Sequence, residues 1–305
     1  MKLKEEKGSA MVLVAMGMVA LLGFTALVTD VGLLHTTRVK LVNSADAAVL
    51  AGAQELPGEP IKAYEVAEEY LYYNDKGDHY HISLNNQNTE IEVSLEKEVQ
   101  FLFAPVLGIS SSNVYAMSKG MVGSLSGYMG AAPLAIPDQN LQYGVQYRLK
   151  APGGDEHELG SGNYGALALG GGGASRYEEN LKHGYQNMLR VGDKVPTESG
   201  NMSGPTKSAL DWRIAQCNHS PNCTFDNHHR ECKRIIIIPV YTGEEEDTTK
   251  IKKVEIVGFA AFFVKNVIGQ GNESEVVGRF VQMVQPGEID AWQKNYGAMG
   301  VKLIN

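Results

Sequence analysis

The chain has 305 residues, of which 43% are hydrophobic and 20% are charged. This length leaves room for two domains, and so large an apolar fraction excludes intrinsic disorder for most of the chain. The formal net charge of −8 argues against a nucleic-acid partner, because such partners require a basic face that displaces counterions.

The N-terminus contains a candidate transmembrane helix. Residues 10–29 (AMVLVAMGMVALLGFTALVT) carry no charge, and about 20 apolar residues span a bilayer core. A signal peptide has an apolar core of only about 7–15 residues, so we expect an uncleaved anchor that follows a cytoplasmic leader at residues 1–9. A buried helix of a soluble protein is the alternative, although stretches this long rarely form one.

The orientation of this anchor is weakly encoded. Lysines precede the apolar stretch, and Arg38 and Lys40 follow it, so the positive-inside bias is small. A short basic leader usually stays in the cytoplasm. We therefore expect a single-pass membrane protein with a cytoplasmic N-terminus and extracytoplasmic C-terminal domains.

The helical pattern continues beyond the membrane segment. Residues 31–54 lack proline and carry apolar side chains at helical spacing. One long helix is predicted, which ends near residue 54 and before Pro57-Gly58.

The N-terminal segment resembles a known family. Lys7-Gly-Ser-Ala, Asp30-Val-Gly and residues 38–53 (RVKLVNSADAAVLAGA) look like the Tad domain of TadE/TadG-like Flp pilus-assembly proteins. Stretches further on, such as residues 162–170 and 257–263, resemble the extended ectodomains of Firmicutes Tad-like proteins. The resemblance covers about the first 55 residues, and its signature positions here are Gly8, Asp30, Asn43, Ala45, Asp46, Ala47, Ala48 and Gly52.

The resemblance implies a bacterial envelope protein of a tight-adherence pilus or a related secretion machine, located in the bacterial cytoplasmic membrane. We expect it to be non-enzymatic. Its partners would be the membrane and other Tad/Flp pilus-assembly or pilin-like proteins, with no nucleic acid. Processed pilin-like members carry a glutamate five residues after the processed glycine, and counting from Gly8 that position is Leu13. We therefore expect the leader to be retained.

Two aspartates of the signature have alternative interpretations. A carboxylate near the apolar boundary is costly unless it finds a partner, so Asp30 and Asp46 could fix the register of neighbouring subunits. Alternatively, Asp30 lies in the headgroup layer and Asp46 on a solvated helix face.

Residues 60–125 predict a small α+β module. An amphipathic helix over 61–74 is followed by a β-hairpin over 79–84 and 90–95. A short helix at 101–107 and a strand at 113–122 complete the order helix, strand, strand, helix, strand.

Residues 132–305 predict a mainly β domain, a barrel or a sandwich. The clearest strands are residues 142–149, 235–241, 254–264 and 276–284, and the run Arg234-Ile-Ile-Ile-Ile-Pro239 is typical of a strand buried on both faces. A helix is expected at 177–185, capped by Ala174-Ser175. The glycine run 170–173 before it lacks the Gly-Lys-Ser/Thr of a phosphate loop, which favours a plain turn.

A polar, turn-rich stretch precedes residue 206. We predict a tightly specified ectodomain loop of Gly200, Asn201, Ser203, Gly204, Pro205 and Thr206. Ser203, together with Asp193 or Asp211 and a histidine, offers the residue types of a hydrolase triad. The sequence contains no nucleophile-elbow motif that would support this interpretation.

The three cysteines, Cys217, Cys223 and Cys232, lie close together in sequence. Outside the cytoplasm a disulfide is their commoner fate, and we favour Cys217 with Cys223. A metal site is the alternative, with zinc held by ligands drawn from Cys217, His219, Cys223, His228, His229 and Cys232, although the spacing is not that of ordinary zinc knuckles.

The sequence therefore predicts an α+β protein with a long N-terminal transmembrane helix, an α+β module and a β-rich extracellular domain. Its hypothesised role is a minor pilin-like structural or assembly component without a cofactor. The rival hypothesis is a membrane-tethered enzyme or metal-binding sensor that uses the Cys217–Cys232 cluster.

Overall fold

A computed structural model describes residues 7–149, 165–198, 200, 202–247, 250–269 and 275–304. The chain forms two compact units. Unit 1 comprises Met1–Ala53, Glu59–Gly120 and Leu303–Asn305, and unit 2 comprises Gln54–Gly58 and Met121–Lys302.

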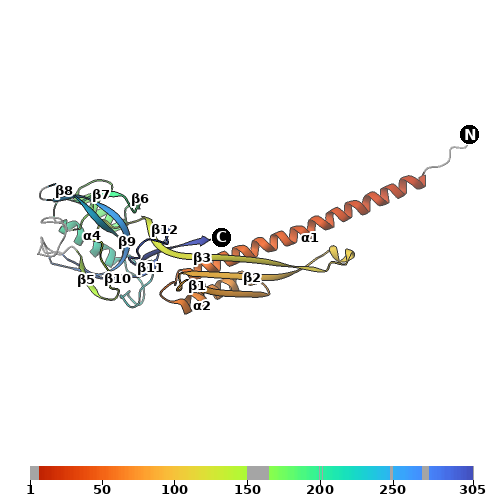
Figure 1. The fold of residues 1–305 in the computed structure, drawn as a ribbon, viewed down its shortest axis with the longest axis horizontal. Coiled ribbons are helices and arrows are strands. Elements are labelled where there is room, and N and C mark those ends of the chain that lie inside the picture. Colours follow the sequence, from red (N-terminus) through yellow and green to blue (C-terminus); the bar gives the residue numbers. More distant parts are fainter. Residues whose placement is uncertain are drawn as a thin grey trace, which may run out of the picture. The chain divides into compact units, whose positions relative to one another are not determined.

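The N-terminal helix α1 (Lys7–Ala53) runs without interruption (Figure 1). The predicted long helix is thereby confirmed. Its first part, residues 10–28, exposes nearly every large apolar side chain, and the most apolar window of the helix is not buried at all. The alternative interpretation was a helix buried in the core of a soluble protein. The exposure of these side chains argues against it and favours contact with an apolar environment outside the chain, such as a membrane.

Unit 1 follows α1 with a small α+β module in the predicted order. The elements are α2 (Pro60–Tyr73), β1 (His79–Asn85), β2 (Glu90–Gln100), the 3₁₀ helix η1 (Ala104–Leu107) and the first part of β3 (Ser111–Met129), whose residues from Met121 onward belong to unit 2. β1 and β2 form an antiparallel hairpin, and β3 is the next strand in the sheet.

The module packs on the second half of α1. Alternation in β2 buries Ile91, Val93 and Leu95, whereas α2 buries Ala63, Ala67 and Leu71 at helical spacing. Both elements contact α1. Unit 1 is therefore a helix pair and a sheet built around one end of the long helix.

Unit 2 contains the remaining elements. Its helices are α3 (Ala174–His183) and α4 (Ser203–Ala215). Its strands after β3 are β4 (Ile136–Pro137), β5 (Gln146–Leu149), β6 (Met188–Arg190), β7 (Lys194–Pro196), β8 (Ile235–Asp247), β9 (Lys250–Ile268), β10 (Glu275–Val281), β11 (Met283–Val284), β12 (Glu288–Asp290) and β13 (Ala298–Ile304).

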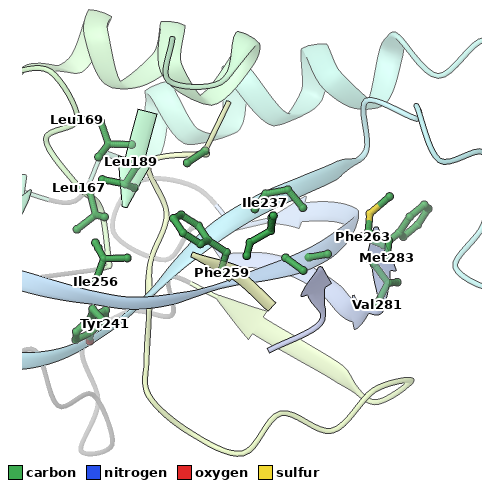
Figure 2. Close-up of a cluster of buried hydrophobic side chains, with 14 of the residues drawn as sticks. Leu167, Leu169, Leu189, Ile237, Tyr241, Ile256, Phe259, Phe263, Val281 and Met283 are labelled. Carbon is green, nitrogen blue, oxygen red and sulfur yellow. The ribbon is translucent and has the colours of Figure 1, made fainter. Parts of the chain in front are cut away.

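The central sheet of unit 2 has the strand order β4-β8-β9-β10-β5, with β7 pairing to β9. The middle parts of two of these strands, residues 236–241 of β8 and 258–264 of β9, are buried on both faces. Ile237, Phe259 and Phe263 belong to one core cluster (Figure 2), whereas Ile236, Ile238 and Phe262 belong to the other. The prediction of a doubly buried apolar strand at 234–239 is confirmed.

Different elements cover the two faces. The second cluster includes Tyr177 and Leu181 of α3 and Leu210 of α4, so helices cover that face. The first cluster includes Leu125 of β3, Leu189 of β6 and residues of β11 and β13. Unit 2 thus has helices on one side of its central sheet and strands on the other, and the described residues form no closed barrel.

The structure corrects three details. A helix, α4, begins at Ser203 where a loop was predicted. α3 begins at Ala174 with Gly173 as its N-cap and no side-chain cap. The strand predicted at 142–149 begins only at Gln146, after a turn at Tyr143-Gly144.

The glycine run before α3 is hydrogen-bonded to a carboxylate side chain of the same chain. Glu198, which is buried, accepts the Gly173 N–H at 2.9 Å and 3.2 Å through its two carboxylate oxygens. Arg176 donates to the carbonyl oxygen of Gly170. Since Glu198 occupies the donor that a phosphate would use, the turn interpretation of residues 170–173 holds.

Candidate functional site

The strongest concentration of reactive side chains lies between α4 and β8. Cys217 follows the end of α4, where its N–H donates to the carbonyl of Ile214. Cys232 lies three residues before β8, and its carbonyl accepts the N–H of Ile235. The chain between them folds back, which brings His219 and Cys223 to the same place.

The ligand atoms of Cys217, His219, Cys223 and Cys232 all lie within 4.8 Å of one another. The two sulfurs of Cys217 and Cys232 are 3.5 Å apart. Nδ1 of His219 is 3.4 Å from the Cys223 sulfur and 3.8 Å from the Cys217 sulfur. These four side chains could bind a metal ion.

The cluster borders the hydrophobic core. Cys223 and Cys232 are 2% exposed and belong to the core cluster of Figure 2, whereas Cys217 and His219 are partly exposed. All three cysteines are free thiols. The Cys217 sulfur contacts the Cys232 sulfur at 3.5 Å, and its favoured disulfide partner, Cys223, lies within 4.8 Å in the same cluster.

Two of the six predicted ligands lie beside the cluster. Nδ1 of His228 contacts the carbonyl oxygen of Phe225 at 2.8 Å. The His229 ring stacks on the His219 ring with centroids 4.2 Å apart, and the His229 N–H donates to the Cys223 sulfur at 3.4 Å. His229 therefore supports two members of the cluster without joining it.

The thiols of the cluster differ in acidity. The hydrogen bond with His219 lowers the pKa of Cys217 to about 6, well below its ordinary value, despite an opposing effect of burial. Burial raises the pKa of Cys232. Cys217 consequently ionises before Cys232.

The predicted loop at 200–206 forms the start of α4. Gly200 has a positive φ of 103°, and Asn201 lies outside the described residues. Ser203, Gly204 and Pro205 form the first helical turn together with Thr206. The Thr206 hydroxyl is buried, donates to the carbonyl of Met202 at 2.7 Å and contacts the Tyr177 hydroxyl at 3.0 Å.

The acids considered as partners of Ser203 are engaged elsewhere. The Asp193 carboxylate accepts the backbone N–H of Arg190 at 2.8 Å. Asp211 forms an ion pair with Lys207 at 2.7 Å on the exposed side of α4. Neither of these contacts connects the carboxylate to the Ser203 hydroxyl.

Asp30 has a specific partner within unit 1. Its carboxylate is 4% exposed, and it accepts backbone N–H groups from the loop that enters η1. The contacts are 2.9 Å from Leu102, 3.1 Å from Phe103 and 2.7 Å from Ala104. Asp30 thus satisfies amides at the start of η1 that would otherwise lack an acceptor.

Small residues within the apolar stretch remain uncovered. A Cβ added at Gly17 or Gly23 would meet no atom of the chain within 4 Å, and the same holds for Gly32, which lies just beyond this stretch. Gly17, Ala20, Gly23 and Ala26 recur every third residue, which places them along one ridge of the helix surface.

Comparison with protein-family models identifies the family of the N-terminal segment. Residues 8–55 match the model of the family described as Flp pilus-assembly TadE/G-like. The N-terminal segment is a Tad domain. The resemblance deduced from the sequence is thereby confirmed. Comparisons with curated proteins and with solved structures gave no match.

The Tad signature packs within its own chain. Ala45 and Ala48 are fully buried, and Gly52 lies so close to α2 and β2 that an added Cβ would be 2.7 Å from both the Ala63 carbonyl oxygen and Cδ1 of Ile91. Ala47 and Asp46 are partly exposed, and Asn43 is exposed. The small residues of the signature therefore let α2 and the sheet approach the helix.

The Tad domain and the apolar helix together indicate membrane association. Gly8 is the second residue of that helix. Sequence reasoning found the domain from its motif and the cysteines from their proximity. It did not find the partner of Asp30, because the loop that binds it lies 72 residues further along the chain.

Proposed function

We propose that the protein is a membrane-anchored structural or assembly component, of minor pilin type, of a Tad/Flp pilus or a related secretion system. The observation that carries this proposal is the Tad domain at residues 8–55, which lies on a helix whose first part exposes an uninterrupted apolar surface. The function is performed by packing of the helix and display of the ectodomain, without a chemical reaction.

The proposed orientation rests on the short basic leader. The short basic leader stays in the cytoplasm, and both folded units lie outside the membrane. The leader is retained, because Leu13 stands where processed pilins carry glutamate.

Helix packing occurs in two regions of α1 with separate roles. In the second half, Ala45, Ala48 and Gly52 are covered by the chain's own α2 and sheet. In the first half, Gly17 and Gly23 are uncovered, and small residues on a membrane helix allow another helix to approach closely. Partner helices of the assembly therefore contact the ridge Gly17, Ala20, Gly23 and Ala26.

Photocrosslinking in the native host tests this function. A photoreactive amino acid replaces Ala20 in the full-length protein, and crosslinked partners are identified by mass spectrometry. Tad/Flp pilus-assembly or pilin-like proteins are the expected partners. Crosslinks to proteins of another system, together with an unchanged number of surface pili after deletion of the gene, would refute the proposal.

A matched pair of variants tests the ridge. Gly23→Ile covers the ridge with a branched side chain, whereas Val19→Ile makes an apolar change at an exposed position of the same segment. The crosslink yield should fall in the first variant only, because a branched side chain on the ridge prevents the close approach of the partner helix.

The rival function, a membrane-tethered enzyme or metal-binding sensor at the Cys217–Cys232 cluster, has less support. A catalytic metal site keeps one coordination position open for water or substrate. The cluster offers four protein ligands, two of them from buried cysteines. Such a site favours a structural role, which is compatible with the assembly function.

A further inference from the structure

The cysteine cluster of unit 2 has the composition and dimensions of a structural metal site. We propose that Cys217, His219, Cys223 and Cys232 bind one zinc ion in a closed tetrahedral Cys₃His site. This assignment is independent of the pilus function, because it concerns only the stability of unit 2.

The distances between the ligand atoms fit a tetrahedron around zinc. Bonds of about 2.3 Å to sulfur and 2.0–2.1 Å to nitrogen imply edges of about 3.8 Å between sulfurs and 3.5 Å between sulfur and nitrogen. The corresponding contacts here are 3.5 Å between the Cys217 and Cys232 sulfurs, and 3.4 Å and 3.8 Å from Nδ1 of His219 to the Cys223 and Cys217 sulfurs. These three distances differ from the tetrahedral values by a few tenths of an ångström, and all pairs of ligand atoms lie within 4.8 Å, so zinc binding requires only a local contraction of the cluster.

The donor set selects zinc by its chemistry. Thiolate and imidazole ligands in tetrahedral geometry favour zinc, whereas hard cations such as calcium prefer oxygen ligands. Zinc binding removes the protons of the three thiols and thereby replaces polar S–H groups at the core boundary by metal bonds.

Neighbouring groups hold the ligands in place. The His229 N–H donates to the Cys223 sulfur, and its ring stacks on His219. The Arg234 guanidinium donates to the Cys223 carbonyl at 2.8 Å and to the Val264 carbonyl of β9 at 3.0 Å. Such supporting contacts orient metal ligands and are typical of built sites.

The position of the site in the fold indicates a structural role. The segment between α4 and β8 contains no helix or strand, and it packs on the core through the cysteines, Phe225 and His228. The zinc ion would join the end of α4 to the start of β8 and close this long connection. Its contribution would be to the folding of unit 2, since a closed site has no position for a substrate.

Elemental analysis of the full-length protein in detergent tests the assignment. We expect about one zinc per chain, and tetrahedral d–d absorption bands when cobalt(II) replaces it. Both tryptophans, Trp212 and Trp292, lie in unit 2, so their fluorescence reports its unfolding, and a chelator should lower the urea midpoint.

Variants separate metal ligation from other roles. Cys232→Ser and His219→Ala remove a direct ligand, so they should lower zinc affinity by more than the roughly tenfold that loss of a supporting contact costs. His219→Cys should retain zinc as a Cys₄ site. His228→Gln is the matched control and should keep the metal. A zinc-free wild-type chain that carries a disulfide, or a His219→Cys chain that loses the metal in spite of folding, would overturn the proposal.

A second and independent observation concerns the loop between β2 and β3. Residues 101–109 (FLFAPVLGI) carry no charge. Leu102, Phe103, Val106 and Ile109 are exposed, with Val106 at 90%. An uncharged loop that exposes so many large apolar side chains marks an interaction surface.

The contacts of Asp30 place this loop at the membrane boundary. Asp30 is the first charged residue after the apolar stretch 10–29, and its carboxylate binds the amides of Leu102 and Ala104. The exposed side chains of the loop therefore lie beside the helix where it would leave the bilayer. We infer that Leu102, Phe103 and Val106 insert into the interfacial layer of the lipid, an inference that rests on the membrane anchoring in the proposed function.

Tryptophan substitution tests this inference in vesicles of equal parts phosphatidylcholine and phosphatidylglycerol. Full-length Val106→Trp should show blue-shifted emission that brominated lipid quenches, after subtraction of the parent signal. Tyr115→Trp, an exposed position further along β3, should show neither effect.

Val19→Trp, within the apolar stretch, reports the anchor itself. Quenching at position 19 without quenching at position 106 would overturn lipid contact by the loop and leave the anchor intact. Absence of quenching at position 19 would instead refute the anchoring in the proposed function.

Discussion

The Asp30 carboxylate accepts the backbone N–H of Ala104 at 2.7 Å, so the long helix is tied to the start of η1 by a charge-assisted hydrogen bond. Leu102 and Phe103 donate to the same carboxylate. One acidic side chain thereby fixes a loop 72 residues away in sequence. This contact offers an alternative to subunit register as the reason for an aspartate in the Tad signature.

Asp30→Asn should release this loop. The asparagine side chain keeps one acceptor oxygen but loses the charge and presents an N–H₂ group toward backbone donors. Hydrogen exchange of the amides at 102–104 should accelerate by about tenfold or more as the loop opens locally. Asp46→Asn, on the same helix and partly exposed, is the control, and equal exchange rates in the two variants would contradict this role of Asp30.

Gly52→Val should destabilise unit 1 by about 1–3 kcal/mol, because overpacking forces the surroundings to move. An added Cβ meets the Ala63 carbonyl oxygen and Ile91 at 2.7 Å. Gly32→Ala is the matched control, since its Cβ meets nothing, and it should stabilise the helix by about 0.5–1 kcal/mol. Urea-dependent proteolysis within residues 60–100, followed by mass spectrometry, measures the stability of unit 1 in both variants. If Gly52→Val left that stability unchanged, the close contact at Gly52 would be refuted.

Sequence patterns predicted the elements whose signal is local. The charge-free run at 10–29, the alternation in Glu90–Gln100 and the apolar run at 234–239 each identified the correct structure. α4 was missed because Gly204 and Pro205 read as turn residues. Proline is also well tolerated in the first turn of a helix, where its missing N–H is not needed, and that is where Pro205 lies.

The candidate sites depended on contacts that no local pattern encodes. Cysteine proximity indicated a cluster, but only the folded loop selects His219 over His228 as its fourth member. Similarly, Glu198 lies 25 residues after Gly173, whose N–H it accepts. Such pairs arise from the topology of unit 2, so composition and spacing could not predict them.

Glu198→Ala should destabilise unit 2 by about 1–3 kcal/mol, because it removes the acceptor of the Gly173 N–H at the start of α3. Glu179→Ala, on the exposed surface of the same helix, should change stability far less. Tryptophan fluorescence during urea unfolding measures both variants. Equal stabilities would mean that water satisfies this donor equally well.

Asp138 should make unit 2 sensitive to acid. Lys294 and Tyr296 donate to its carboxylate at 2.6 Å and 2.7 Å and hold its pKa below the ordinary value. A folded pKa below the unfolded one stabilises the protein above the unfolded pKa of about 3.9, and this contribution disappears as the pH falls through the folded pKa. Unfolding midpoints measured between about pH 5 and pH 2 should therefore fall more steeply in the wild type than in Asp138→Asn. Asp211→Asn controls for the loss of one acidic charge, and parallel curves for wild type and Asp138→Asn would contradict the prediction.

The leader should remain on the mature protein. A prepilin peptidase would cut after Gly8, and Leu13 replaces the glutamate expected five residues later. Intact mass of the wild-type chain should be unchanged by co-expression of a Tad-type prepilin peptidase. Leu13→Glu restores the missing side chain and should be shortened in the same cells, which shows that the peptidase is active. A shortened wild-type chain would contradict the prediction. A full-length Leu13→Glu chain would mean that the peptidase does not recognise the segment around Gly8, and the wild-type leader would then also be retained.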